Sequence, residues 1–322
     1  MKRLWFSYIL TLILLIFVVV ILFWMFKPYL SGKFSLTTPL PDSLTSYVNR
    51  QVSTLNLWFP SAKSEEGNTV QKPVTSARAA VIYDLTTEKF LFEKNKDGKL
   101  PMASLTKIMT AIVALENKKQ DDSYVVSKND LVGEDSMGLS EGEVLTLEDL
   151  LYGLMLPSGN DAAETLASNY SGGRNEFVKA MNDKVEALGL KNTHFTNPSG
   201  LQGDGEQYTT ASDLLVITRY VLSNFSLFRK VVLTVEQVIP YSSNHKAFYL
   251  YNETNLLTSY PGVKGVKTGY TPEAGLCLVT YLEYKGHKII GVILGSNNRR
   301  EEMKELLDYS LRTLGVEPPS HG

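Results

Sequence analysis

The sequence contains one cysteine, Cys277, among 322 residues. A single thiol can neither form an internal disulfide nor build a thiolate zinc site, so disulfide-rich scaffolds and cysteine zinc modules are excluded. Basic residues number 32 and acidic residues 34, which gives a formal charge of -2. Because there is no positive excess to neutralise a phosphate backbone, nucleic acid is not expected as the main partner.

Several catalytic signatures are also missing from the sequence. The 4 histidines form no H-E-x-x-H pair, which disfavours a zinc peptidase. The segment GVKGVKTGY lacks the G-x-x-x-x-G-K-[ST] pattern of a phosphate-binding loop. The sequence therefore predicts no cofactor and no metal.

Residues 4–26 form a long apolar run without a charged side chain. At 1.5 Å per residue, a helix of this length spans a bilayer core of roughly 30 Å. A cleavable secretory signal is the alternative, but the run exceeds a usual signal core and no A-x-A-like site follows it. Lys2 and Arg3 precede the run and favour a cytoplasmic N-terminus. We therefore expect a single-pass anchor in the cytoplasmic membrane, with residues 1–3 inside and the rest on the extracytoplasmic side.

Residues 27–76 contain much Pro, Ser and Thr and predict a linker, followed by a folded domain over residues 77–316 and a tail over residues 317–322. The expected strands are 79–83, 89–93, 263–268, 276–284 and 287–294, and the expected helices are 105–116, 147–155, 162–170, 174–188, 212–222 and 300–314. Strands at both ends of a helix-rich middle predict an α+β fold. We expect an antiparallel five-stranded sheet flanked by helices, with an inserted helical subdomain.

The first chemical motif is Ser104-Leu105-Thr106-Lys107, which precedes an apolar run typical of a buried helix. Positions i and i+3 share a helix face, so the Lys107 amine can reach the Ser104 hydroxyl. Burial disfavours the ammonium and lowers the lysine pKa toward the range of a general base. Free N–H groups at the helix start could stabilise an oxyanion at Ser104. Alternatively, Ser104 is only a helix cap and Lys107 a solvated side chain.

The second motif is Ser158-Gly159-Asn160, between two predicted helices. These residue types favour helix starts, so capping alone could explain them. In a catalytic site, Ser158 could relay a proton and Asn160 could hold a substrate amide.

The third motif is Lys267-Thr268-Gly269, at the end of a predicted strand. It offers a cation, a hydroxyl and a backbone that a substrate can approach closely, because glycine has no Cβ. An ordinary edge lysine that prevents aggregation is the alternative.

Taken in order, the three motifs resemble the penicilloyl-serine transferases, which include class A β-lactamases and penicillin-binding proteins. The segments PMASLTKIMTA, LMLPSGNDAAE, ALGLKNTHFTNPSGL and GVKTGYTPEAG are similar to the low-molecular-mass D-alanyl-D-alanine carboxypeptidases. This resemblance covers about residues 77–314 and implies the β-lactamase/transpeptidase-like fold. It also implies removal of the terminal D-alanine from peptidoglycan stem pentapeptides, and β-lactam antibiotics as covalent inhibitors.

The resemblance also implies the roles of individual residues. Ser104 would be the acylated nucleophile and Lys107 its base, with Ser158 and Asn160 as the second catalytic element. Residues 267–269 would bind the substrate.

Three further positions follow from the same resemblance. The backbone N–H groups of Ser104 and Tyr270 would form the oxyanion hole, although many relatives have histidine where Tyr270 stands. Arg299 or Arg300 would receive the terminal carboxylate of the substrate, and Arg300 is the candidate retained. Relatives also often have histidine in place of Ser199, to which no role is assigned. The N-terminal span would replace the C-terminal membrane helix of typical members.

Other functions on the same fold stay open. A D,D-endopeptidase would use the same residues on cross-linked peptides. A class A β-lactamase needs a deacylating glutamate, but its usual E-x-x-L-N is absent between Asn160 and Lys267. A non-catalytic cell-wall binding protein could keep the fold, since fold does not fix function. The intact Ser104 and Lys107 argue against that last function.

Overall fold

The computed structural model describes residues 57–61 and 70–321. The predicted anchor at residues 4–26 and most of the predicted linker lie outside these residues. Within the part of the chain that is described, no helix is both long enough and apolar enough to span a bilayer.

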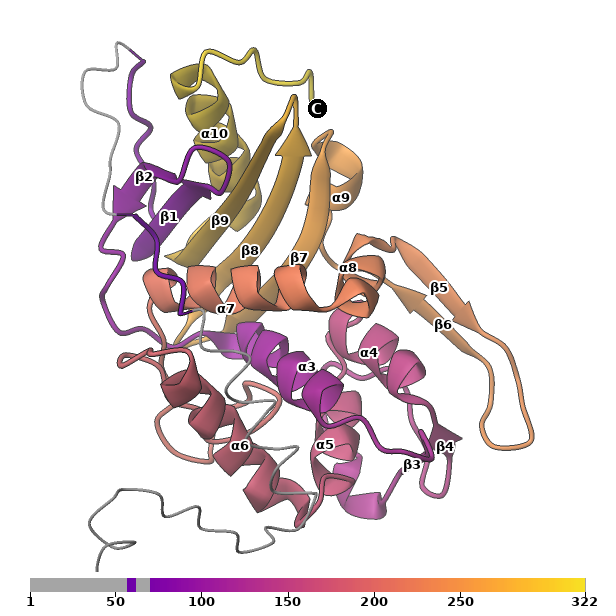
Figure 1. Ribbon diagram of the computed structural model, residues 1–322. Coiled ribbons are helices and arrows are strands. Elements are labelled where there is room, and N and C mark those ends of the chain that lie inside the picture. The colour runs from indigo at the N-terminus through magenta and orange to yellow at the C-terminus, as the bar shows by residue number, and fades with distance from the viewer. Residues whose placement is uncertain (1–56, 62–69, 322) are drawn as a thin grey trace, which may run out of the picture. The chain divides into compact units, whose positions relative to one another are not determined.

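The core of the domain is an antiparallel sheet of five strands in the order β2-β1-β9-β8-β7 (Figure 1). The strands are β1 (Ala79–Asp84), β2 (Lys89–Lys94), β7 (Val263–Thr271), β8 (Gly275–Tyr284) and β9 (His287–Ser296). Strand β1 pairs with β9, with Ala79 opposite Leu294. The prediction that strands from both ends of the domain share one sheet is therefore confirmed.

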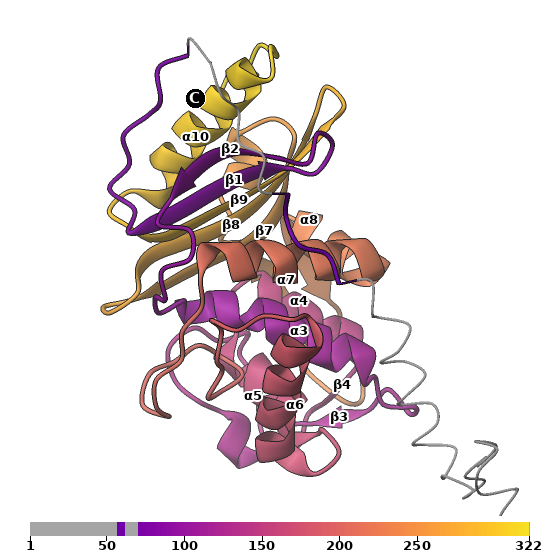
Figure 2. The ribbon, with the colours of Figure 1, turned by 60° about the vertical axis from the view of Figure 1, so that its left-hand side comes forward.

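Both faces of this sheet are buried, and alternate residues of β1 face different layers. Ala80 and Ile82 pack with Met303 and Leu307 of α10 (Arg299–Thr313). Val81 and Tyr83 belong to the larger core on the opposite face. Figures 1 and 2 show α10 on one face of the sheet and α7 on the other. This arrangement follows from the two-residue period of a strand, which sends successive side chains to opposite faces.

The chain between β2 and β7 is mainly helical, as predicted. Its helices are η1 (Ala103–Thr106), α3 (Lys107–Glu116), η2 (Lys128–Asp130), α4 (Leu147–Met155), α5 (Asn160–Ser168), α6 (Gly173–Ala187), α7 (Ala211–Asn224), α8 (Ser226–Leu233) and α9 (Leu256–Ser259). Helix α7 lies between the sheet and α3, and α4, α5 and α6 form the layer beyond (Figure 2). At the start of α4, Thr146 and Asp149 each accept a hydrogen bond from the other's backbone N–H, at 3.2 Å. This capping box fixes where α4 begins.

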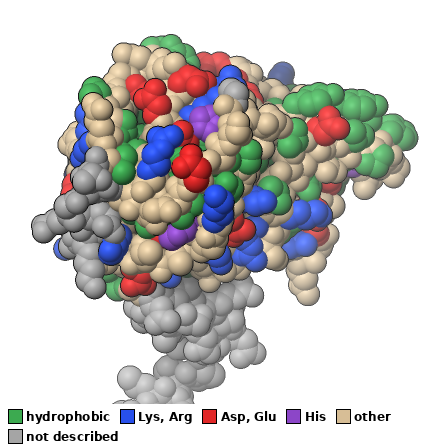
Figure 3. Space-filling model, turned by 90° about the horizontal axis from the view of Figure 1, so that it is seen from above, with side chains coloured by type: hydrophobic (Ala, Val, Ile, Leu, Met, Phe, Trp, Pro, Cys, Tyr) green, Lys and Arg blue, Asp and Glu red, His purple; other side chains and the backbone are tan. Residues whose placement is uncertain are grey.

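Four short strands were not predicted. Strands β3 (Tyr124–Val125) and β4 (Val144–Leu145) form one pair, and β5 (Glu236–Ile239) and β6 (Phe248–Tyr251) form another. The β5–β6 hairpin projects from the domain in Figure 1, and hydrophobic side chains cover this arm in Figure 3. Strands of two to four residues are too short to give a clear alternating pattern.

Described residues upstream of residue 77 also contact the domain. The Trp58 ring packs edge-on against Tyr83 at 5.5 Å between centroids, and the Arg219 guanidinium lies 4.2 Å from the Trp58 ring centroid. Thr75 donates a hydrogen bond of 2.7 Å to Glu302 on α10. The domain boundaries given above stay predictions.

Candidate active site

Ser104 lies in η1, a 3-10 turn that leads directly into α3. The preceding residue, Ala103, has a left-handed backbone with φ of 50°. The α-helix itself begins at Lys107, so the expected helix over 105–116 is shorter at its start. Neither η1 nor α3 has a side-chain N-cap hydrogen bond, so the alternative that Ser104 only caps a helix is wrong.

The Lys107 side chain is fully buried, with 0% exposure, and its amine lies among three oxygen atoms. Its Nζ is 2.9 Å from Ser104 Oγ, 2.7 Å from Asn160 Oδ1 and 2.7 Å from the Ser199 carbonyl oxygen. The predicted pairing of Ser104 with Lys107 is therefore present in the structure, and the alternative of a solvated lysine is wrong.

The electrostatic surroundings of Lys107 favour its neutral form. Burial lowers the pKa of Lys107 well below its usual range, and the positive charge of Lys267 lowers it further. Asp135, Glu253 and Asp161 oppose this effect. A neutral amine at physiological pH is what a general base requires.

The three contacts match the hydrogen-bonding capacity of a neutral amine. Such an amine has two N–H donors and one lone pair. Asn160 Oδ1 and the Ser199 carbonyl can only accept hydrogen bonds, so they take the two N–H groups. The lone pair is then left for the hydroxyl proton of Ser104. The geometry thus orients Lys107 to remove that proton.

The second motif occupies the turn between α4 and α5. Ser158 has a left-handed backbone with φ of 64° and is 1% exposed. Its Oγ has no hydrogen-bond partner among the described residues. The Asn160 N–H donates to the Asp135 carbonyl oxygen at 2.8 Å, which fixes the start of α5. The strained turn thus holds an unpaired hydroxyl beside the residue that contacts Lys107.

The third motif lies on β7, next to η1. Lys267 is 1% exposed, and burial lowers its pKa to about 8. A Cβ placed on Gly269 would lie 3.1 Å from the Ser104 backbone nitrogen, so a side chain here would crowd the nucleophile's amide. Tyr270 follows, pairs with Leu276 of β8 and is 61% exposed.

The two candidate arginines differ in their surroundings. Arg299 donates hydrogen bonds from Nη1 to the carbonyl oxygens of Gly269, at 2.6 Å, and Cys277, at 3.3 Å. Arg300 instead has its Nε 3.5 Å from Glu301 Oε1. The structure therefore places Arg299 at the motif strand, and the substrate-binding role given to Arg300 stays a prediction.

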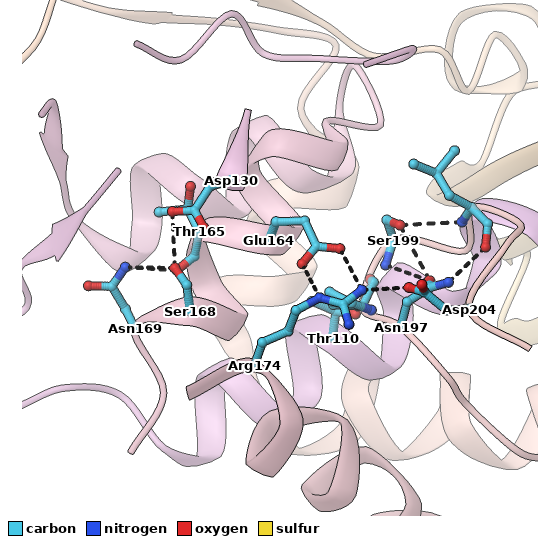
Figure 4. Close-up of polar contacts among 12 residues, drawn as sticks. Thr110, Asp130, Glu164, Thr165, Ser168, Asn169, Arg174, Asn197, Ser199 and Asp204 are labelled. Carbon is cyan, nitrogen blue, oxygen red and sulfur yellow. Dashed lines mark hydrogen bonds and ion pairs between the residues drawn. The ribbon is translucent and has the colours of Figure 1, made fainter. Parts of the chain in front are cut away.

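The loop over residues 197–200 supports the base and was not expected to take part. Asn197 Oδ1 accepts a hydrogen bond from Ser199 N at 3.2 Å (Figure 4). It also accepts one from Gly200 N at 2.7 Å. The Thr110 hydroxyl donates to the Pro198 carbonyl at 2.5 Å. Gly200 has φ of 90°, and a Cβ there would lie 2.1 Å from the Ala103 carbonyl oxygen. The loop therefore fits against η1 only with glycine at this position.

Asp161 and Glu164 are two further buried acids that the sequence did not single out. The Asp161 carboxylate accepts hydrogen bonds from the Ser136 hydroxyl at 2.5 Å and from three successive backbone N–H groups, those of Met137, Gly138 and Leu139. Glu164 pairs with Arg174 at 2.7 Å, and Arg174 also binds Asp204 (Figure 4). These contacts hold two loops against α5. The only sequence signal was the polar run SGND at 158–161.

Within residues 57–61 and 70–321, no group of three or more His, Cys, Asp or Glu side chains could hold a metal ion. The groups brought together in the site are Ser104, Ser158, the two lysines and their neighbours. On an antiparallel sheet with this helical insertion, a serine paired with a buried lysine defines a serine acyl-transfer enzyme of the penicilloyl-serine transferase class.

Comparison with known proteins narrows this class. Residues 66–298 match the D-alanyl-D-alanine carboxypeptidase family, peptidase S11. The chain is 35% identical over 269 residues to the D-alanyl-D-alanine carboxypeptidase DacF of Bacillus subtilis (strain 168), covering 80% of this chain and 68% of that protein. It is also 35% identical over 260 residues to the D-alanyl-D-alanine carboxypeptidase of Streptomyces sp. (strain K15), covering 74% of this chain and 89% of that protein.

The fold is similar to solved structures as well. The crystal structure of the Streptomyces K15 DD-transpeptidase aligns with a TM-score of 0.70 and 33% identity, over 76% of this chain and 100% of that chain. The chain therefore belongs to the D-alanyl-D-alanine carboxypeptidase family, and the expected family and fold are confirmed.

Proposed function

We propose that the protein removes the terminal D-alanine from peptidoglycan stem pentapeptides through an acyl-enzyme on Ser104. The observation that carries this proposal is the placement of Lys107 Nζ 2.9 Å from Ser104 Oγ in a fully buried position. Family membership and the DacF relative support the choice of substrate class.

In the first step, Ser104 Oγ bonds to the carbonyl carbon of the penultimate D-alanine while its proton passes to Lys107. The oxyanion would be held by the backbone N–H groups of Ser104 and Tyr270. Collapse of the tetrahedral intermediate breaks the C–N bond, and the leaving amine takes the proton held by Lys107, relayed through the Ser158 hydroxyl, so that Lys107 is neutral again. D-alanine then departs and Ser104 is left as an ester.

In the second step, water attacks the ester carbonyl and Lys107 accepts a proton from it. The ester C–O bond breaks, the proton returns to Ser104 and the shortened peptide is released. In the first step, the Lys267 ammonium and the Thr268 hydroxyl would bind the terminal carboxylate of the substrate until D-alanine departs, because both groups are buried on β7, which contacts η1.

The test is release of free D-alanine from a pentapeptide ending in D-Ala-D-Ala. We expect release by the wild-type protein and none by Ser104→Ala, since alanine has no nucleophilic oxygen. A cross-linked peptide in a parallel reaction measures D,D-endopeptidase activity. Equal release by Ser104→Ala and wild type would show that another residue is the nucleophile.

We further propose that residues 4–26 anchor the protein in the cytoplasmic membrane, with the catalytic domain on the extracytoplasmic side. The support is the uncharged length of this run and the missing cleavage site after it. The protein in its native host should then resist extraction by alkaline carbonate and retain its N-terminus. Recovery of a chain that begins near residues 31–34 would contradict the anchor.

A further inference from the structure

Glu253 lies in the turn after β6 at a position that the three motifs do not include. Its backbone N–H donates to the Leu156 carbonyl at the end of α4, at 3.1 Å. The preceding Asn252 donates to the carbonyls of Val232, at 3.3 Å, and Thr234, at 2.9 Å. The turn is therefore tied to both α4 and α8, and the backbone of Glu253 has a fixed place.

The carboxylate of Glu253 reaches the substrate-binding strand. Thr268 donates a hydrogen bond from Oγ1 to Glu253 Oε2 at 3.4 Å. Glu253 itself is exposed, whereas Thr268 and its neighbour Lys267 are buried. An acidic side chain thus sits at the solvent side of the strand and contacts the residue that follows Lys267, the cation expected to bind the substrate carboxylate.

Three charged groups act on Lys267. Glu253 in the turn after β6 and Asp135 in the loop after η2 favour its ammonium, and Glu253 has the larger effect. Arg299 on α10 disfavours it, and Lys107 on α3 carries no charge in its neutral form. Burial opposes the ammonium more strongly than any of these charges. The two acids therefore favour a charged Lys267 against the effects of burial and of the Arg299 guanidinium.

The two lysines of the site need opposite protonation states. Lys107 must be neutral to accept the Ser104 proton, and Lys267 must be charged to bind a carboxylate. The Lys267 charge itself favours neutral Lys107. Among the charges that favour the ammonium form, Glu253 has the largest effect on Lys267. On Lys107, the effect of Glu253 is smaller than that of Asp135.

We propose that Glu253 is a positioning residue that keeps Lys267 protonated and orients the Thr268 hydroxyl, and that it thereby sets the alkaline limit of the enzyme's activity. This role rests on the proposed function of the site. It assigns to Glu253 no contact with the reacting atoms.

The experiment is the pH profile of acylation by a fluorescent penicillin, whose carboxylate probes the same strand, from pH 6 to pH 10. In Glu253→Gln a negative charge is lost beside Lys267, so its ammonium should deprotonate at lower pH. We expect the alkaline limb to move down by roughly half to one pH unit, as for the loss of one partly solvated charge. Glu253→Asp keeps the charge, so its alkaline limb should shift less than that of Glu253→Gln.

A matched control is Glu273→Gln, which removes the same charge from an exposed residue in the β7–β8 turn. Its limb should stay at the wild-type position. Asp135→Asn is a second test, since it should shift the limb in the same direction even if Glu253→Gln folds poorly. Circular dichroism identifies the folded variants.

An unmoved alkaline limb in folded Glu253→Gln would overturn the inference. Faster acylation at every pH with an unmoved limb would also overturn it, because Glu253 would then only repel the incoming carboxylate. Neither result affects the role of Ser104. If the wild-type protein is not acylated at all, the proposed function fails, and this inference fails with it.

Discussion

Lys107→Arg is expected to lower the rate of Ser104 acylation by roughly 10²- to 10⁴-fold, the usual contribution of a general base. Arginine keeps the positive charge and much of the length of the side chain, but its guanidinium does not lose a proton near neutral pH. The buried position between Asn160 Oδ1 and the Ser199 carbonyl would hold a permanent cation. Such a cation has no lone pair for the Ser104 proton.

Lys107→Met is the matched control, because methionine removes the charge and keeps the length. The measurement is the second-order acylation rate by a fluorescent penicillin, with circular dichroism to confirm folding. If Lys107 is the base, both variants lose activity. If Lys107 supplies only positive potential, the arginine variant keeps most of the rate and the methionine variant does not.

Asn160→Asp is expected to shift acylation to higher pH. The Asn160 oxygen lies 2.7 Å from Lys107 Nζ, so a carboxylate here would form a buried ion pair with the ammonium. An opposite charge at this distance raises a lysine pKa by roughly one to three units. Because the base must be neutral, acylation at neutral pH should fall by roughly tenfold for each unit by which the raised pKa exceeds the assay pH.

The pH profile distinguishes this effect from simple damage to the site. Raising the pH should restore part of the Asn160→Asp rate, since the lysine then loses its proton. Asn160→Ala, which adds no charge, should show no such recovery if its defect lies in substrate binding. An Asn160→Asp defect that is equal at all pH values would mean that Asn160 does not influence the protonation of Lys107.

The sequence predicted the sheet and the pairing of Ser104 with Lys107 because both depend on local patterns. Strands β1 and β9 are short, nearly continuous apolar runs, as expected for strands buried on both faces, and the spacing in S-x-x-K puts two side chains on one face. The 3-10 turn at Ser104 was missed. Its cause is the left-handed Ala103 and the close fit of Gly200, which join residues about one hundred positions apart.

Two parts of the site could not be read from spacing at all. Lys107 contacts the backbone carbonyl oxygen of Ser199. Every residue type has this group, so the side chain at position 199 gave no signal. Glu253 reaches Thr268 only because the turn after β6 is tied to α4 and α8. Contacts of this kind depend on tertiary packing, which no single segment of the sequence encodes.

The central claim is that Ser104 is the acylated nucleophile, and mass spectrometry after incubation with penicillin tests it most directly. Because the acylation groups are present and the E-x-x-L-N of class A β-lactamases is absent, the full chain should gain one stable penicilloyl group. Peptide mapping should place it on Ser104, and Ser104→Ala should gain none. An adduct on another residue, or rapid penicillin turnover without a detectable adduct, would contradict the account.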